Sequence, residues 1–202
     1  MQLFQHLDVN NCGTICANEL YDYMSKHYLA PRMSDAQDII REYDGSQDSR
    51  LNFDEFCQLA LPSTSPHLRH SAETKRHSPY HQARAPIPYD VLSLFTRLLE
   101  KEMQLQRTRN KSQRQLANER EFSKARAFDA IARGCSAIQV PDFIYFAERN
   151  GYFPRAEDIE AILRRCDHDA NRQIGFSEFC EQVSADRVVE AAPEEKKAEA
   201  VA

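Results

Sequence analysis

The sequence of 202 residues contains no Trp, and it has no apolar run of the eighteen or so residues that a membrane-spanning helix requires. No apolar signal segment follows Met1, and the next residue is not the Gly that N-myristoylation needs. These absences predict a protein without a membrane partner. The six Cys mostly occupy apolar helical or loop positions, so we expect reduced thiols and a cytoplasmic location.

Patterns that support catalysis are absent as well. The chain shows no activated nucleophile, no Gly-rich phosphate-binding loop and no catalytic metal motif, so we expect that it is not an enzyme. It is also poor in Met, with Met24, Met33 and Met103 besides Met1. Because surfaces that bind many partners rely on adaptable Met side chains, this composition favours one dedicated partner.

Charge is distributed unevenly along the chain. Residues 1–61 carry 4 basic and 10 acidic side chains, a net of −6, and residues 127–184 carry 6 and 10, a net of −4. Between them, residues 62–126 carry 13 basic and 6 acidic side chains, a net of +7. Two acidic regions therefore flank a basic middle, and we expect the middle to prefer acidic partners.

The most specific pattern lies at residues 167–178, DHDANRQIGFSE. A hard cation such as Ca²⁺ takes about six to eight oxygen ligands, and a twelve-residue loop can supply them from positions 1, 3, 5, 7, 9 and 12. The protein ligands at these positions are the side chains of Asp167, Asp169, Asn171 and Glu178 and the carbonyl group of Gln173. With a water at position 9, the sequence predicts a calcium site in this loop.

Amphipathic helices are predicted on both sides of this loop. Before it, Ile159, Ile162, Leu163 and Cys166 form one helical stripe, and a similar apolar pattern follows it. Helix, acidic loop and helix in this order resemble the last hand of calmodulin-like proteins in the EF-hand superfamily. Arg172 stands at position 6, where the sharp turn normally uses Gly, and this departure is expected to weaken binding by about 1 kcal/mol or more.

An internal repeat becomes visible when the chain is shifted by 123 residues, because Asp167 then falls on Asp44 and Glu178 on Glu55. Residues 44–55 therefore form a second loop of the same kind, with Ser49 at the turn position. The predicted calcium ligands are Asp44, Ser46, Asp48, Asn52 and Glu55 together with the carbonyl group of Arg50. The alternative is a loop that is held only by pairing with its neighbour.

Residues 8–19 form another loop with an altered donor set. Its oxygen donors are Asp8, Asn10, Thr14 and Glu19. Cys12 and Cys16 stand at positions 5 and 9, and thiol sulfur suits zinc or copper better than Ca²⁺. Three interpretations stay open: a structural loop that binds calcium weakly or not at all, which the sulfur favours, a functional calcium site, and a soft-metal or redox site.

A last unit is recognisable by its apolar frame, with Phe128 and Ile131 before residues 132–142 and Ile138 within them. This loop has eleven residues, and Arg133 and Cys135 stand among positions that need oxygen donors. We expect it to bind no calcium and to serve as the structural partner of residues 167–178.

The four units together resemble calmodulin, centrin and troponin C in the EF-hand superfamily. We therefore predict an all-α fold with two EF-hand pairs, at residues 1–61 and 122–184, in which short β pairing joins the loops of each pair. The resemblance implies Ca²⁺ as the ligand and an apolar groove that grips a partner helix.

The middle of the chain lies outside this resemblance. Residues 62–88 contain five Pro and four His, which predicts a flexible linker, with metal binding by the His as the alternative. Residues 89–121 contain neither Pro nor Gly, which predicts one long helix or two joined helices. Residues 185–202 are expected to form a disordered tail.

The basic part of the long helix, residues 104–118, contains four cations and no acidic residue: Arg107, Arg109, Lys111 and Arg114. Exposed pairs with the acidic regions of the chain itself would contribute only about 0–1 kcal/mol each. A solvated spacer is the simpler interpretation, and docking on an external acidic surface, which could engage all four cations at once, is the hypothesis that gives them a role. Nucleic acid is not expected, because the stretch has no aromatic stacking series.

Two functions follow from these patterns. The first is a calcium-responsive regulatory subunit that grips one dedicated partner helix, which the intact donors of two loops favour. The second is a structural subunit of a cytoskeletal or axonemal assembly of a cilium or flagellum. In that case a tubulin-like filament would be the acidic partner, and calcium would be secondary.

Overall fold

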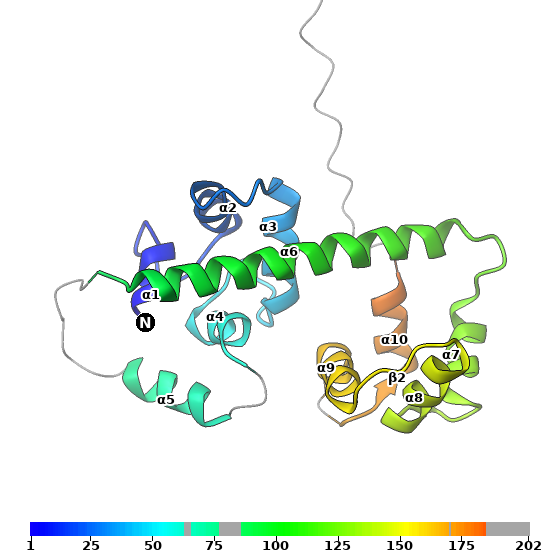
Figure 1. Cartoon of the computed structure of the whole chain (residues 1–202). Helices are drawn as coiled ribbons and strands as arrows, with labels where there is room; N and C mark the ends of the chain where they lie inside the picture. The colour runs from blue at the N-terminus through cyan, green and yellow to red at the C-terminus, as the bar shows by residue number, and fades with distance from the viewer. Residues whose placement is uncertain (63–65, 77–85, 170, 185–202) are drawn as a thin grey trace, which may run out of the picture. The chain divides into compact units, whose positions relative to one another are not determined.

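The computed structural model describes residues 1–62, 66–76, 86–169 and 171–184, so the tail expected at 185–202 lies outside the described residues. Figure 1 shows a chain built from helices with two very short strands. It divides into two compact units, Met1–Arg109 and Asn110–Ala202, and each has its own apolar core. No helix in the described part is long and apolar enough to cross a membrane.

The N-terminal unit contains two helix-loop-helix units that share one core. Their helices are α1 (Gln2–Leu7), α2 (Ala17–Lys26), α3 (Met33–Tyr43) and α4 (Phe53–Ala60). The two loops are joined by an antiparallel bridge, in which the N–H group of Ile15 donates to the carbonyl of Leu51 at 2.8 Å and the reverse bond measures 2.9 Å. Both side chains are fully buried, so the bridge fixes the loops to each other and to the core.

The helix α6 (Tyr89–Asn118) covers the apolar face of these four helices with its first part. Phe95, Leu99 and Met103 recur every four residues, share one helical stripe, and are at most 5% exposed. The ring of Phe95 lies 5.6 Å from the rings of Tyr23 on α2 and Phe56 on α4. Figure 1 shows the helices α2 and α4 alongside α6.

The start of α6 thus belongs to the N-terminal unit, as far as Arg109. This corrects the interpretation of residues 89–121 as a region separate from residues 1–61. An apolar stripe indicates which face of a helix is buried, but it does not indicate which segment covers that face.

The helix α5 (Pro66–Arg76) corrects the prediction of a linker throughout residues 62–88. Ala72 packs against the N-terminal core, next to an apolar cavity of about 480 Å³ that is also lined by residues of α1, α4 and α6. Pro66 stands where its missing N–H group costs nothing, and the next ten residues contain neither Pro nor Gly. His67 and His70 join no metal-like cluster of described residues, and the other two His lie outside the described ranges.

The C-terminal unit repeats the arrangement of two helix-loop-helix units. Its elements are α7 (Lys124–Ala132), β1 (Ala137–Ile138), α8 (Val140–Arg149), α9 (Ala156–Cys166), β2 (Ile174–Gly175) and α10 (Phe176–Val183). The strands pair antiparallel, with Ile138 opposite Ile174 and both side chains at most 2% exposed. The pairing therefore links the two loops through the centre of the core, as in the N-terminal unit.

Candidate metal centre

The loop at residues 167–178 is folded around the carboxylates at its two ends. Asp167 follows the last residue of α9, and its carboxylate accepts hydrogen bonds from the N–H groups of Asn171 at 3.1 Å and Arg172 at 2.8 Å. Glu178 lies in the first turn of α10 and accepts from the N–H groups of His168 and Gly175, both at 2.8 Å. The backbone thus curls inward and presents oxygen atoms to a common centre.

Three acidic side chains meet at this centre. One carboxylate oxygen from each of Asp167, Asp169 and Glu178 lies within 4.8 Å of the others. Since Ca²⁺ binds oxygen at about 2.3–2.6 Å, two ligands on opposite sides of one ion are roughly 5 Å apart, and the spacing fits this ion. Asn171 adds an oxygen that now accepts from the N–H group of Gln173 at 2.8 Å. The donors are hard oxygens, which suit Ca²⁺.

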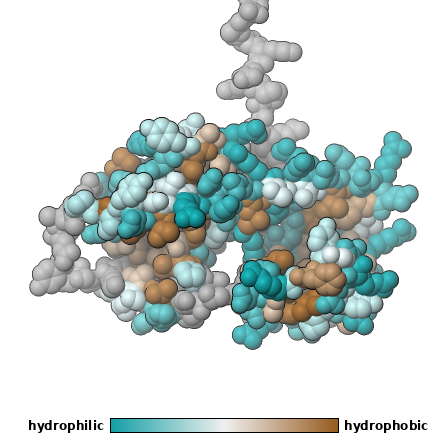
Figure 2. Space-filling view, in the orientation of Figure 1, coloured by the Kyte–Doolittle hydropathy of each residue, from teal (hydrophilic) through white to brown (hydrophobic). Residues whose placement is uncertain are grey.

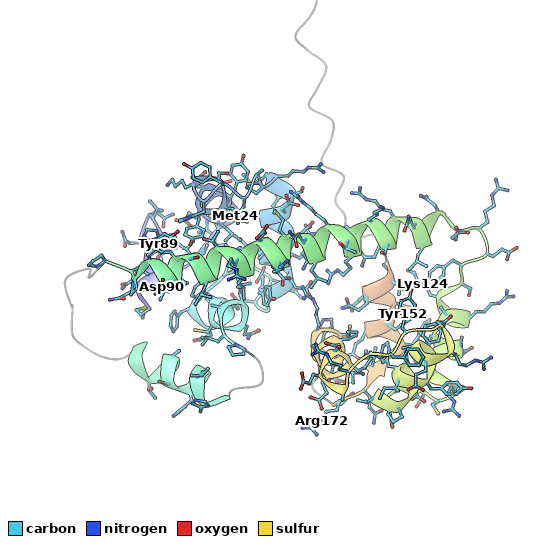
Figure 3. The ribbon with its side chains drawn as sticks, in the orientation of Figure 1. Met24, Tyr89, Asp90, Lys124, Tyr152 and Arg172 are labelled. Atoms are coloured by element: carbon cyan, nitrogen blue, oxygen red, sulfur yellow. The ribbon has the colours of Figure 1, made fainter. Side chains whose placement is uncertain are left out.

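The sharp turn at position 6 is made without Gly in two of the loops. Arg172 has a φ of 63° and Ser49 has a φ of 61°, whereas Gly13 fills the same position at 85°. Figure 3 labels Arg172 at the outer edge of its loop, where the side chain is exposed. A left-handed conformation costs a non-Gly residue roughly 1–2 kcal/mol, so the loop is formed against local strain.

The loop at residues 44–55 has the same frame. The carboxylate of Asp44 accepts from the N–H groups of Asp48 at 3.2 Å and Ser49 at 2.7 Å, and from the hydroxyl of Ser46 at 3.1 Å. Glu55 accepts from the N–H groups of Ser46 and Asn52, both at 2.9 Å. The backbone therefore holds both terminal carboxylates as it does in residues 167–178.

Two of the predicted ligands in this loop accept hydrogen bonds from nearby backbone N–H groups. The side chain of Asn52 accepts from two N–H groups at the start of α4, and the carboxylate of Asp48 accepts from the N–H group of Arg50. Among the described residues, Asp44, Asp48 and Glu55 do not gather as the acidic group of residues 167–178 does. The bond between Asp48 and Arg50 joins positions 5 and 7, as the bond between Asn171 and Gln173 does in residues 167–178.

The loop at residues 8–19 has the same backbone hydrogen bonds to its two terminal carboxylates, but it lacks oxygen ligands at positions 5 and 9. Asp8 accepts from the N–H groups of Cys12 and Gly13, and Glu19 accepts from those of Val9 and Cys16. The thiol of Cys12 lies 3.2 Å from the hydroxyl of Thr14, and the side chain of Asn10 accepts from the N–H group of Cys12. In the part of the chain that the structure describes, the two thiols and these acids form no metal-like cluster, so the geometry gives the soft-metal interpretation no support.

The loop at residues 132–142 serves the pairing of strands. Arg133 and Gly134 adopt positive φ values of 57° and 80°, and the chain then enters β1. Asp142, at the last position, accepts from the N–H group of Gln139 and so caps α8.

The basic residues of α6 divide into two groups. Arg107 donates two hydrogen bonds to Asp35 of α3, at 2.9 and 2.6 Å, and Arg109 lies 2.8 Å from the carboxylate of Glu42. Lys111 and Arg114 are exposed. The expectation that all four cations face an external surface is therefore wrong for Arg107 and Arg109. Their partners stand more than sixty residues away in the sequence, and no local pattern indicates them.

The Arg107 to Asp35 pair is a strong one, because it is bidentate and the Asp35 side chain is only 5% exposed. Burial raises the pKa of Asp35, but the hydrogen bonds from Arg107 and from the N–H group of Arg32 outweigh this effect and leave that pKa below its usual value. The hydrogen bonding to Asp35 raises the pKa of Arg107. Both side chains are therefore held in their charged forms.

Comparison with known proteins identifies the class of the N-terminal unit. The family model of the EF-hand domain pair matches residues 1–61, so this segment is an EF-hand domain pair, and such a domain implies calcium binding. The chain is similar to Calcium-dependent protein kinase 21 of Arabidopsis thaliana and Calcium-dependent protein kinase 19 of Oryza sativa subsp. japonica, each at 38% identity over 56 residues. These matches cover 28% of this chain and 10% of each relative.

Proposed function

We propose that the protein binds two calcium ions, one in residues 44–55 and one in residues 167–178, and that α7 to α10 form a second EF-hand pair. The observation that carries this proposal is the grouping of the Asp167, Asp169 and Glu178 carboxylates within 4.8 Å. The left-handed turn at position 6, the inward-facing N–H groups and the paired loops support it. The matched relatives are kinases, but we propose a binding protein without enzymatic activity of its own.

In this proposal the protein is a calcium-responsive regulatory subunit in the cytoplasm, and its C-terminal pair grips a helix of one dedicated partner. The N-terminal unit supports the idea, because its EF-hand pair already holds a helix, α6, on its apolar face. The C-terminal unit carries large apolar side chains that are exposed, among them Phe146, Ile162 and Phe176. Exposed apolar groups of this size are typical of a binding surface.

A structural subunit of a cytoskeletal or ciliary assembly is the second candidate. The exposed cations Lys111 and Arg114 favour it, because they are available to an acidic filament surface. In that case the protein would associate with its assembly whether or not calcium is present.

Isothermal titration of the whole chain with CaCl₂ tests the calcium sites. We expect two ions with dissociation constants of roughly micromolar to hundreds of micromolar. Glu178→Gln removes half of a bidentate ligand and should abolish one site alone, and Glu55→Gln should abolish the other. Glu157→Gln, an exposed residue of α9 outside the loops, is the matched control and should leave both sites intact. Binding of four ions, or of none at millimolar calcium, would refute the assignment.

A further inference from the structure

The two helix-loop-helix pairs are repeats of each other, but α6 contributes apolar side chains to the described core cluster of the N-terminal unit alone. In the C-terminal unit the contact from α6 is polar, because the buried side chain of Gln113 donates to the carbonyl of Gln182 at 2.6 Å. In the N-terminal unit, Phe95, Leu99 and Met103 of α6 are part of the core cluster. In the C-terminal unit, the described residues of the core cluster come from α7 to α10 and their loops, and none comes from α6. The shift of 123 residues pairs each residue of the face that α6 covers with an equivalent residue of the C-terminal unit.

Equivalent residues at the bottom of the apolar face have similar exposure in the two units, whereas those at its outer positions do not. At the bottom, Phe56 and its repeat equivalent Phe179 are both buried, at 4% and 7% exposure. The outer positions differ sharply. The three pairs are Tyr23 at 5% and Phe146 at 39%, Ile39 at 0% and Ile162 at 44%, and Phe53 at 4% and Phe176 at 46%. The positions that are closed in the N-terminal unit, where α6 completes the core, are thus open and still apolar in the C-terminal unit.

Further apolar side chains extend this surface. Figure 2 shows brown side chains over the segment that joins α8 to α9, and Figure 3 labels Tyr152 there. Tyr152 is 71% exposed and Phe153 is 81% exposed. Phe153 is the repeat equivalent of Ala30, whose carbonyl accepts a long hydrogen bond from Arg107 at 3.5 Å. Within the C-terminal unit, the apolar surface therefore includes the repeat equivalent of the residue that contacts Arg107 in the N-terminal unit.

The contacts of α6 indicate what kind of helix the open face fits. Phe95 packs on Tyr23 and Phe56, and the equivalents of these two rings are Phe146 and Phe179. Leu99 and Met103 follow at intervals of four residues and are buried. A helix with large apolar residues at i, i+4 and i+8 would cover the open face in the same way.

The charge at the end of the face is repeated too. Arg107 stands four residues after Met103 and binds Asp35, and the equivalent of Asp35 is Asp158. In the C-terminal unit Asp158 pairs instead with its neighbour Arg155, at 3.1 and 3.2 Å, and these side chains are 48% and 77% exposed. An exposed pair of this kind contributes little to stability, so an incoming Arg can replace Arg155.

We propose that the C-terminal pair binds an amphipathic helix of a partner protein that carries large apolar residues at i, i+4 and i+8 and an Arg at i+12. The apolar residues lie over Phe146, Ile162 and Phe176, and the Arg binds Asp158. This inference rests on the proposed function of α7 to α10 as an EF-hand pair. Since Phe146 lacks the hydroxyl that Tyr23 places 3.2 Å from the hydroxyl of Thr96, the partner needs no polar residue at i+1.

A peptide with the sequence of residues 89–109 contains this pattern and serves as the probe. Labelled with fluorescein, it should bind the full-length protein in calcium with 1:1 stoichiometry, as measured by anisotropy. Phe146→Asn and Ile162→Asn should each weaken binding by roughly tenfold or more, because they place an amide in an apolar contact. Tyr28→Asn is the control, since Tyr28 is an apolar ring of the N-terminal unit that is 95% exposed, and it should leave binding unchanged.

The charge contact is tested by a double-mutant cycle. Asp158→Asn should weaken binding of the wild-type peptide by roughly tenfold, and it should not weaken binding of a peptide in which Arg107 is replaced by Ala. Circular dichroism and calcium titration of each variant show whether it is folded.

Three results would overturn the inference. One is absence of peptide binding while two calcium ions still bind, which leaves the proposed calcium function intact. Another is binding that Phe146→Asn and Ile162→Asn do not change, which indicates exchange with α6 in the N-terminal unit. The third is self-association of the full-length chain that Ile162→Asn abolishes, which identifies a second copy of the chain as the occupant.

Discussion

Leu99→Ala tests whether α6 is an integral part of the N-terminal EF-hand unit. The Leu99 side chain is 0% exposed in the core that α6 shares with α1 to α4. Removing it forfeits the free energy of burying a Leu side chain and leaves a cavity, and such changes cost about 2–5 kcal/mol in unfolding free energy. Leu94→Ala is a matched control, because Leu94 lies on the same helix and is 64% exposed.

Both substitutions change the intrinsic helix propensity of α6 equally, so the difference between them reports packing alone. We expect Leu94→Ala to change the unfolding free energy by less than about 1 kcal/mol. Urea unfolding followed by circular dichroism gives the total change. Hydrogen exchange of peptides from α2 and α4 then assigns the loss of protection to the N-terminal unit, since the chain has two cores that can unfold separately.

The thermal midpoint of the N-terminal unit should fall by roughly 4–8 °C for each kcal/mol lost. Equal effects of Leu99→Ala and Leu94→Ala would refute the placement of α6 on the EF-hand pair. So would unchanged exchange in α2 and α4 for a Leu99→Ala protein that is otherwise destabilised.

Three other predictions concern charge and backbone strain. Arg107→Gln leaves the buried carboxylate of Asp35 without its bidentate partner and should destabilise the N-terminal unit by about 1–3 kcal/mol, whereas the exposed control Arg114→Gln should have little effect. Folding lowers the pKa of Asp35, so the stabilisation from the ion pair is fully present above the ordinary pKa near 3.9. This stabilisation is lost as pH falls through the pKa of the folded state. Acid unfolding curves of Asp35→Asn should therefore lack the loss of stability that Asp35 causes. Arg172→Gly removes a left-handed non-Gly residue and should stabilise the C-terminal unit by about 1 kcal/mol in thermal unfolding. An unchanged or lower midpoint would contradict the strain argument.

The loops could be predicted from the sequence because their information is local. Twelve consecutive residues place Asp167 and Glu178 at the two ends of one turn, and a β-branched residue at position 8 suits the strand that pairs with the neighbouring loop. The structure brings Ile174 opposite Ile138 and Leu51 opposite Ile15. The helices on either side follow from their apolar stripes for the same reason, since the repeat of 3.6 residues is visible within a few turns.

The role of α6 could not be predicted, because its partners are distant in the chain. The stripe of Phe95 and Leu99 indicates a buried face, but that face could cover either acidic region or a partner. The ion pairs of Arg107 and Arg109 depend on the same docking, and the pairing energy expected for exposed side chains underestimates them, because Asp35 and Glu42 are 5% and 8% exposed. The helix α5 was not predicted because the Pro and His content of residues 62–88 favours a linker, although residues 66–76 form a helix.

The bridge between Ile15 and Leu51 gives residues 8–19 a structural role that does not depend on their metal ligands. Residues 8–19 contribute to the unit through Ile15, which is 1% exposed, and through Thr14, whose hydroxyl accepts a hydrogen bond from Arg50 at 3.3 Å. Neither contact needs a bound ion, so substitution of a donor such as Asn10 should disturb the pairing of the loops less than substitution of Ile15. Arg50 also contributes the carbonyl at position 7 of the neighbouring loop. A loop can thus support its neighbour through backbone pairing and one side-chain hydrogen bond, whatever its own donor set.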